Sequence, residues 1–160
     1  MSVLPTHALS LNAATAASVV TEFFDRYRAH DVEGMIDLCA VNADFSYVPL
    51  EIWGKQRVLR GDGKVATIGK PIWSGLIASF PDLTNVVHSM VANDDGDVVA
   101  EVSIGGTQQL AWAQVAPAGR SYSDPHLFVF QVGPDLLIDA VTAYWDNGSM
   151  TCQLGHVEVD

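Results

Sequence analysis

The chain has 160 residues, 49% of them hydrophobic and 17% charged, which predicts one domain over residues 1–160 with a sizeable core and excludes a disordered chain. Eight Lys and Arg against nineteen Asp and Glu give a net charge of −11, and the basic residues are scattered, so neither nucleic acid nor an anionic membrane is an expected partner. The chain has two cysteines far apart in sequence, and its first 20 residues contain neither a basic segment nor an uninterrupted hydrophobic block. These features predict a protein of the reducing cytoplasm.

The first helix is predicted after an N-terminal arm over residues 1–11. Asn12 or Thr15 can cap it, and it is expected to end near His30. Its apolar residues recur at helical spacing, which predicts a wide buried face. They are Val19, Val20, Phe23, Phe24 and Tyr27.

Two further helices, a short strand and a loop are predicted next. Asp31 can cap a second helix over 32–40, and a short strand over 44–49 is expected to stop at a proline. Three glycines punctuate residues 50–63, where much of the positive charge gathers, which indicates a rim loop. A third helix is expected over 71–80, because proline is tolerated in the first turn of a helix.

After Pro81 the pattern changes from helical to alternating, which predicts a meander of strands. Helices followed by strands indicate an α+β domain whose helices pack on one face of an antiparallel sheet. The predicted strands cover 84–93, 97–106, 109–115, 123–132 and 136–145.

Both faces of the predicted sheet carry apolar side chains. In the penultimate strand His126, Phe128 and Phe130 lie on one side, and Leu127 and Val129 lie on the other. One layer of helices covers one face only, and an antiparallel sheet usually leaves its second face to water. An apolar second face therefore predicts a partner surface, most simply a homodimer.

Four landmarks from Val19 onward resemble the SnoaL-like polyketide cyclases of the nuclear transport factor two-like superfamily. They are FFDRYRAHDVEGMIDLCA from Phe23, FPDL from Phe80, GTQQLAWAQVAPAGR from Gly106, and YWD with QLG near the C-terminus. This resemblance implies a cone-shaped fold with three helices in the concave face of a strongly curved mixed or antiparallel sheet. It also implies an apolar pocket in the mouth of the cone and dimerisation through the outer sheet face.

His126 is the main candidate catalytic residue. Its strand parity, with the resemblance, places it on the concave side, where an imidazole with an unperturbed pKa of about 6.5 can move protons near neutral pH. The alternative is a core histidine satisfied by a backbone carbonyl. Asp124 shares its parity and can orient the ring, although the proline between them can introduce a bulge that turns Asp124 outward.

Asp139 is the second candidate acid or base. By parity it faces inward with Val141, and the acid on the last strand of the related cyclases falls on Asp139 or on Ala140. If it falls on Ala140, the cyclase mechanism loses its principal residue. Ketosteroid isomerases are similar as well, and their helical tyrosine matches Tyr27. Their two aspartates fall on Val48 and Phe128, however, which argues against that isomerase mechanism.

Tyr27 and Tyr47 are candidate hydroxyl donors to a bound carbonyl or enolate oxygen, and the other aromatic residues can wall a flat, ring-shaped ligand. The alternative for these aromatic residues is plain core packing. The candidate binding residues are Tyr47, Trp73, Trp112, Phe128, Phe130, Val141 and Trp145.

These residues support two functional hypotheses. The first is a cofactor-independent cyclase, isomerase or dehydratase that uses general acid/base chemistry on a hydrophobic, cyclic or polyketide-like carbonyl compound. The second is a non-catalytic small-molecule-binding or dimerisation module of the same fold. The five histidines form no short-range pair and there is no Cys-x-x-Cys motif, so neither a metal nor another cofactor is expected.

Overall fold

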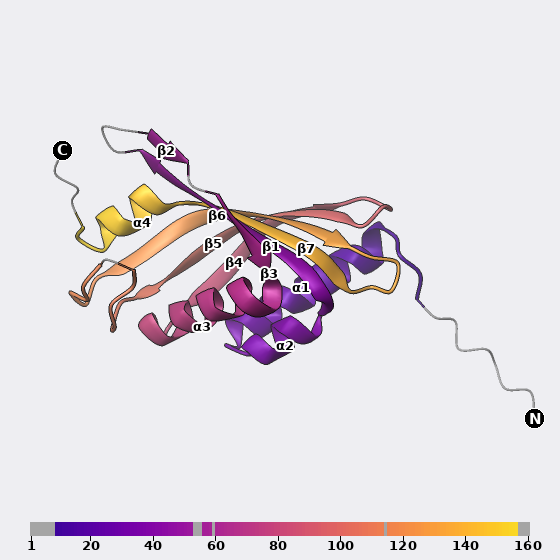
Figure 1. The fold of residues 1–160 in the computed structure, drawn as a ribbon, viewed down its shortest axis with the longest axis horizontal. Helices are drawn as coiled ribbons and strands as arrows, with labels where there is room; N and C mark the ends of the chain where they lie inside the picture. Colours follow the sequence, from indigo (N-terminus) through magenta and orange to yellow (C-terminus); the bar gives the residue numbers. More distant parts are fainter. Residues whose placement is uncertain (1–8, 53–55, 59, 114, 157–160) are drawn as a thin grey trace, which may run out of the picture.

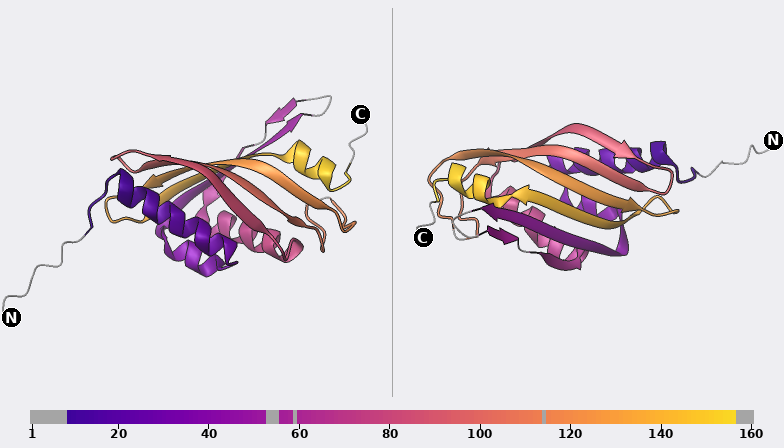
Figure 2. Two further views of the ribbon diagram at one scale, coloured as in Figure 1. Left: turned by 180° about the vertical axis from the view of Figure 1, so that it is seen from behind. Right: turned by 90° about the horizontal axis from the view of Figure 1, so that it is seen from above.

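Three helices lie on one face of a mixed, seven-stranded sheet in the computed structural model, which describes residues 9–52, 56–58, 60–113 and 115–156 (Figures 1 and 2). The strand order is β2-β1-β7-β6-β5-β4, and β3 also pairs with β1. The β1–β7 pair is parallel and the other pairs are antiparallel. The helices are α1 (Ala13–Arg28), α2 (Val32–Asp37), α3 (Lys70–Ser79) and α4 (Asn147–Gln153). The strands are β1 (Cys39–Ile52), β2 (Gln56–Val58), β3 (Gly61–Lys64), β4 (Thr84–Ala92), β5 (Asp97–Thr107), β6 (Ser121–Val132) and β7 (Ile138–Asp146).

The predicted caps start α1 and α2. Asn12 and Thr15 form a capping box, in which each side chain accepts a hydrogen bond from the backbone N–H of the other residue. The Asp31 carboxylate accepts from the N–H of Gly34 at 2.9 Å and starts α2. The apolar face of α1 is buried against the sheet, as its helical spacing predicts.

Three predictions for residues 32–63 were wrong. The second helix ends at Asp37, because β1 begins at Cys39 and runs for 14 residues through Pro49. Pro49 interrupts nothing, since it lies between the parts of β1 that pair with β3 and with β2. The rim loop over 50–63 contains strands β2 and β3, although residues 53–55 and 59 lie outside the described residues. Figure 1 shows β2 and the end of β1 projecting beyond the sheet as a narrow ribbon.

The predicted strand over 109–115 is instead part of the loop between β5 and β6. Its described residues form one isolated bridge between Trp112 and Val115, and Ala113 has a φ of 50°. The buried side-chain amide of Gln108 donates hydrogen bonds to the carbonyls of Leu110 and Val115. This side-chain amide supplies hydrogen bonds that a neighbouring strand would otherwise supply, so a segment with an alternating pattern can form a loop here.

The outer face of the sheet has no helix of the α1–α3 layer on it (Figure 2). Several of its apolar side chains are exposed, among them Val86 at 53% and Leu127 at 37%. The homodimer that this pattern predicts stays a prediction. None of the helices in the described part of the chain has the length and hydrophobicity needed to cross a bilayer.

Candidate functional site

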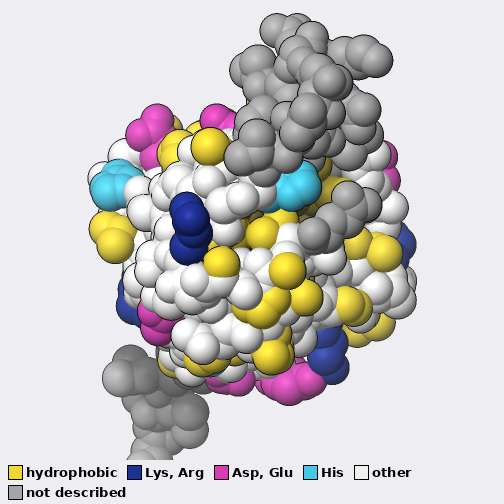
Figure 3. Space-filling model, turned by 90° about the vertical axis from the view of Figure 1, so that its left-hand side faces the viewer, with side chains coloured by type: hydrophobic (Ala, Val, Ile, Leu, Met, Phe, Trp, Pro, Cys, Tyr) yellow, Lys and Arg dark blue, Asp and Glu magenta, His cyan; other side chains and the backbone are white. Residues whose placement is uncertain are grey.

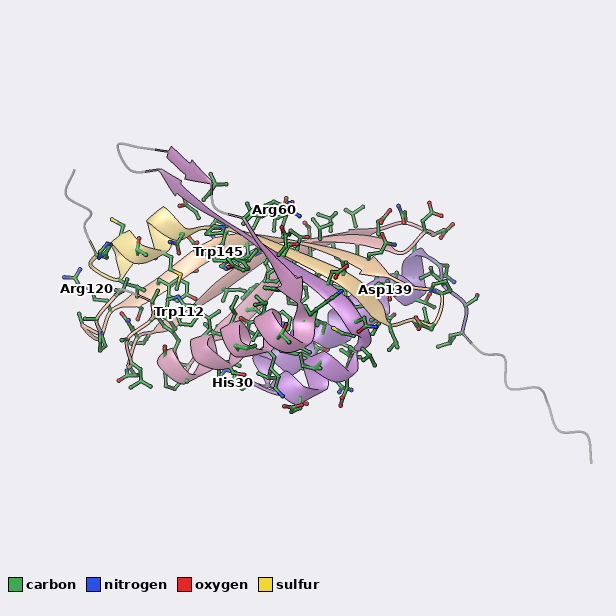
Figure 4. The ribbon with its side chains drawn as sticks, in the orientation of Figure 1. His30, Arg60, Trp112, Arg120, Asp139 and Trp145 are labelled. Atoms are coloured by element: carbon green, nitrogen blue, oxygen red, sulfur yellow. The ribbon has the colours of Figure 1, made fainter. Side chains whose placement is uncertain are left out.

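A small, mainly apolar cavity lies between α1, α3 and the inner face of strands β5–β7. Its volume is about 40 Å³, which is room for about three water molecules. Trp112 and Trp145 lie at the same end of the molecule (Figure 4), and hydrophobic side chains gather on the surface of that end (Figure 3). The lining residues are Tyr27, Phe45, Ile72, Trp73, Leu76, Ile104, Trp112, Tyr122, His126, Phe128, Ala143, Trp145 and Met150.

His126 lies in the cavity wall between two aromatic rings. Its ring is nearly parallel to those of Phe128 and Trp145, with centroid separations of 6.0 Å and interplanar angles of 15° and 11°. Burial among these rings lowers the pKa of His126 to about 4, against the smaller opposing effect of its hydrogen bond to the Asp124 backbone. The imidazole is therefore neutral at pH 7.

The two nitrogens of His126 have different environments. Nδ1 lies 3.1 Å from the backbone carbonyl oxygen of Asp124, which can only accept, so Nδ1 carries the proton. Nε2 consequently has a free lone pair, and it has no hydrogen-bond partner in the described part of the chain. The alternative of a core histidine bonded to a backbone carbonyl therefore holds for Nδ1 only. Nε2 stays available to a ligand.

Asp124 is buried, with 1% of its surface exposed, so the proline beside it does not turn it outward. It supports the ring of His126 through its backbone carbonyl rather than its carboxylate. Neither carboxylate oxygen has a well-formed hydrogen bond within the described residues. Burial raises the pKa of Asp124 to about 6, although the nearby Ser149 hydroxyl and the Asp146 backbone favour its ionised form.

Two tyrosines bring hydroxyl groups to the cavity. Tyr27 comes from α1 and Tyr122 from β6, and burial strongly raises the pKa of both, so both are neutral phenols. Their hydroxyls have no hydrogen-bond partners in the described part of the chain. Tyr122 is absent from the residues that the sequence predicts, although it lies four residues before His126 and so has the same strand parity.

Asp139 lies outside the site, contrary to the prediction. A register shift in the β6–β7 pairing makes Asp139 an extra residue between Ile138 and Ala140, and its side chain is exposed. Ile138 therefore shares the buried face with Val141, although the two residues are three positions apart. Figure 4 shows Asp139 at the opposite end of the sheet from Trp112 and Trp145. Ala140 does not line the cavity either, so neither candidate position for the family's last-strand acid contributes to it.

The predicted binding residues divide into two groups. Trp73, Trp112, Phe128 and Trp145 line the cavity, together with the predicted catalytic residues Tyr27 and His126. Tyr47, Phe130 and Val141 do not line it. Tyr47 packs beside the rings of Phe45 and Trp145, and Phe130 packs in the core against Phe23. Within the described residues no group of three or more His, Cys, Asp or Glu side chains could hold a metal ion.

The cone-shaped α+β architecture, with helices in the concave face of a curved sheet, defines a protein of the nuclear transport factor two-like class. A family model described as a SnoaL-like domain matches residues 20–147, so the chain belongs to the SnoaL-like family. No match was found among curated proteins.

Solved structures share this fold along nearly their whole length. AclR from Streptomyces galilaeus, a proposed hydroxylase, has a TM-score of 0.74 at 18% identity, covering 91% of this chain and 99% of AclR. A proposed SnoaL-like polyketide cyclase from Jannaschia sp. CCS1 has a TM-score of 0.70 at 15% identity, covering 99% of both chains. IdmH from Streptomyces antibioticus, a proposed polyketide cyclase, has a TM-score of 0.67 at 23% identity, covering 88% of this chain and 99% of IdmH.

Proposed function

We propose that this SnoaL-like protein is a cofactor-independent enzyme that moves a proton next to the carbonyl group of a hydrophobic, cyclic or polyketide-like compound bound in the cavity. The observation that carries the proposal is His126, a neutral imidazole with an unpartnered Nε2 in an apolar cavity wall. A titratable group in an apolar pocket beside neutral hydroxyl donors is typical of acid/base sites. The polyketide cyclase assignments of IdmH and the Jannaschia protein favour this compound class.

In the proposed reaction, Nε2 of His126 takes a proton from the carbon next to the carbonyl group and leaves an enolate. The hydroxyl of Tyr27 donates a hydrogen bond to the enolate oxygen, where the negative charge develops. With a pKa of about 4, the imidazole is a weak base in the empty cavity, but the adjacent enolate stabilises the imidazolium that forms. In an isomerisation the imidazolium returns the proton to another carbon of the conjugated enolate. In a ring closure the enolate carbon attacks a second carbonyl group of the same compound, whose oxygen takes the proton, and in a dehydration a β-hydroxyl group takes the proton and leaves as water.

A ring-shaped ligand needs more space than the cavity offers. About 40 Å³ is far below the roughly 300–1,000 Å³ of ordinary ligand pockets, so wall side chains must move on binding. Trp112 is the wall residue carried by the β5–β6 loop, where it packs against α3 at Gly75. Loops move more readily than strands and helices, so we expect the ring of Trp112 to be displaced by the ligand.

The test uses 2-tetralone, a neutral bicyclic ketone, as the probe. Proton NMR in D₂O follows the exchange of its α-protons for deuterium, with and without the protein. The wild type is expected to accelerate this exchange, and His126→Gln is expected to lower the acceleration by about 100-fold, a usual contribution of one general base. His88→Gln is the matched control, because His88 is exposed and contacts Ser103. Equal acceleration by wild type and His126→Gln would refute the assignment of the base.

A second candidate function is ligand binding without turnover. It is favoured by the backbone bond at Nδ1 of His126 and by the lack of a carboxylate among the described lining residues. Trp73, Trp112 and Trp145 line the cavity, so their fluorescence reports binding directly. Quenching by 2-tetralone without any α-proton exchange would support this second function over the first.

A further inference from the structure

Three polar groups at one end of the β6 inner face lack hydrogen-bond partners in the described part of the chain. They are the hydroxyls of Tyr27 and Tyr122 and the carboxyl group of Asp124. The two oxygens of Asp124 are fully buried, whereas the hydroxyls of Tyr27 and Tyr122 are not among the sealed, unpartnered atoms and belong to residues that line the cavity. Buried polar groups in folded proteins nearly always have partners, which makes this carboxyl group, beside two cavity-lining hydroxyls, a candidate for completion by a ligand.

We propose that the hydroxyls of Tyr27 and Tyr122 together bind one oxygen atom of the ligand, and that Asp124 is a positioning residue that acts on this oxygen through Tyr122. The inference rests on the proposed function, because it places the ligand in the same cavity. It adds Tyr122 as an oxygen-binding group and assigns Asp124 a role separate from the ring of His126.

Both hydroxyls are presented by rigid parts of the fold. The ring of Tyr27 packs edge-to-face on Trp73 with centroids 6.4 Å apart, and the ring of Tyr122 packs edge-to-face on Phe80 at 5.0 Å. The two rings come from α1 and β6, and both line the same cavity. Two such held donors can bind an oxygen without first having to be ordered.

Asp124 lies beside Tyr122 on the buried face of β6 and packs against α4. Ser149 of α4 faces it with a hydroxyl that lowers its pKa, and Asp146, the last residue of β7, raises its pKa through its charge and lowers it through its backbone. On its own strand the neighbours with the same parity are Tyr122 and the neutral His126. Within the described residues, no cation is among the groups that shift the pKa of Asp124.

The protonation state of Asp124 should therefore change how well the cavity holds an oxygen. When Asp124 is protonated, both tyrosine hydroxyls are free to donate to a ligand oxygen that carries partial negative charge. When Asp124 is ionised, its carboxylate repels that oxygen and competes for the hydroxyl of Tyr122. Because the pKa of Asp124 is about 6, oxygen binding is expected to weaken as the pH rises from 5 to 8.

The experiment compares two probes that differ by one oxygen, 2-tetralone and tetralin, using tryptophan fluorescence to measure both dissociation constants. The wild type at pH 5 is expected to bind 2-tetralone about tenfold more tightly than tetralin, the factor that one ordinary hydrogen bond supplies. Tyr27→Phe and Tyr122→Phe should each remove most of this preference and leave tetralin binding unchanged. Tetralin thus reports whether a variant has kept the cavity intact.

The pH profile tests the role of Asp124. The preference of the wild type for 2-tetralone is expected to fall several-fold between pH 5 and pH 8, and Asp124→Asn should keep it constant. A wild-type preference that Tyr122→Phe leaves unchanged, or a pH profile that Asp124→Asn leaves unchanged, would overturn the inference. Loss of α-proton exchange in His126→Gln would then still support the proposed function. If neither probe binds the wild type, both the inference and the proposed function fail.

Discussion

The inner face of β6 has an apolar half that is well packed and a polar half whose hydrogen-bonding groups are incompletely paired. Phe128 and Phe130 pack edge-to-face against the phenylalanine rings of α1, with centroids 5.1–5.7 Å apart. Tyr122, Asp124 and His126 follow the same alternation on the same strand, yet each keeps a polar atom without a partner in the described part of the chain. The difference comes from what packs opposite them. The first half packs on α1, with Phe128 also at the cavity wall, and the second faces the cavity and α4.

This comparison separates stability from function within one strand. The phenylalanine half is filled and contributes hydrophobic burial, which is the largest favourable term in folding. In the polar half the buried carboxyl group of Asp124 is left unpaired, which lowers the folding free energy gained there. Regions that are less stable than their neighbours and carry perturbed titratable groups are typical of functional sites. Substitutions in the two halves should therefore have opposite effects on stability.

The largest expected effect is in the filled half. Phe130→Ala removes a ring that is 1% exposed, and it should lower the free energy of unfolding by about 3–5 kcal/mol, from lost burial and the cavity left behind. Urea unfolding at pH 7 measures the change. Leu127→Ala on the outer face is the control, because its side chain is 37% exposed and should cost less than half as much. Equal losses in the two variants would mean that the outer face is as tightly packed as the core.

Asp124→Asn should raise the stability of the protein at pH 8. Because the pKa of Asp124 is about 6 in the folded protein and 3.8 ordinarily, the folded state binds the proton more tightly, and stability is lost as the pH rises from about 4 to about 6. Replacing the carboxyl group removes this loss, so the variant should gain about 1–3 kcal/mol at pH 8 and nothing below pH 4.

His126 has the opposite linkage, which gives this prediction a second signature. Its pKa falls from 6.5 to about 4 on folding, so its contribution to stability is present above pH 6.5 and lost as the pH falls to about 4. In the wild type the two slopes oppose each other between pH 4 and pH 6. In Asp124→Asn only the pH dependence of stability due to His126 should remain, so the urea midpoint should rise between pH 4 and pH 6. If Asp124→Asn is less stable than the wild type at pH 8, the Asp124 carboxylate is not both buried and unpaired in the folded protein.

The smallest expected effect is that of Tyr122→Phe, which keeps the ring and removes a hydroxyl without a partner among the described residues. The free energy of unfolding should change by less than about 0.5 kcal/mol, or increase slightly, because no hydrogen bond is lost. The same urea measurement decides this. A loss of more than about 1 kcal/mol would show that the hydroxyl already has a partner in the unliganded protein.

Much of the architecture could be predicted from local patterns. The caps of α1 and α2, and four of the five strands predicted after Pro81, follow from short-range rules that depend on neighbouring residues. The parity of Asp124 and His126 was also right, because alternation is fixed by the pleat of the strand. Asp139 was misplaced because it is the extra residue of a bulge in β7, which breaks the alternation that relates it to Val141.

Other features had no reliable local signal. The segment over 109–115 alternates as a strand does, but Gln108 holds it as a loop through bonds to two carbonyls. Helix α4 occupies the place of a neighbouring strand beside Ser123, where the side-chain amide of Gln153 bonds to both backbone groups of Ser123. Tyr122 could have been found by extending the parity of His126 by four residues, although parity alone does not show that a hydroxyl lines a cavity.

The sequence by itself determined the class of fold and the family, because periodicity, caps and motif order survive in a linear chain of residues. Only the tertiary structure decided which members of the inner face lack partners, since that depends on residues far apart in sequence meeting or failing to meet. Tyr27 and Tyr122 lie 95 positions apart and line one cavity. The packing of α1, α3, α4 and β6 around the same space creates that chemistry, and no local pattern encodes it.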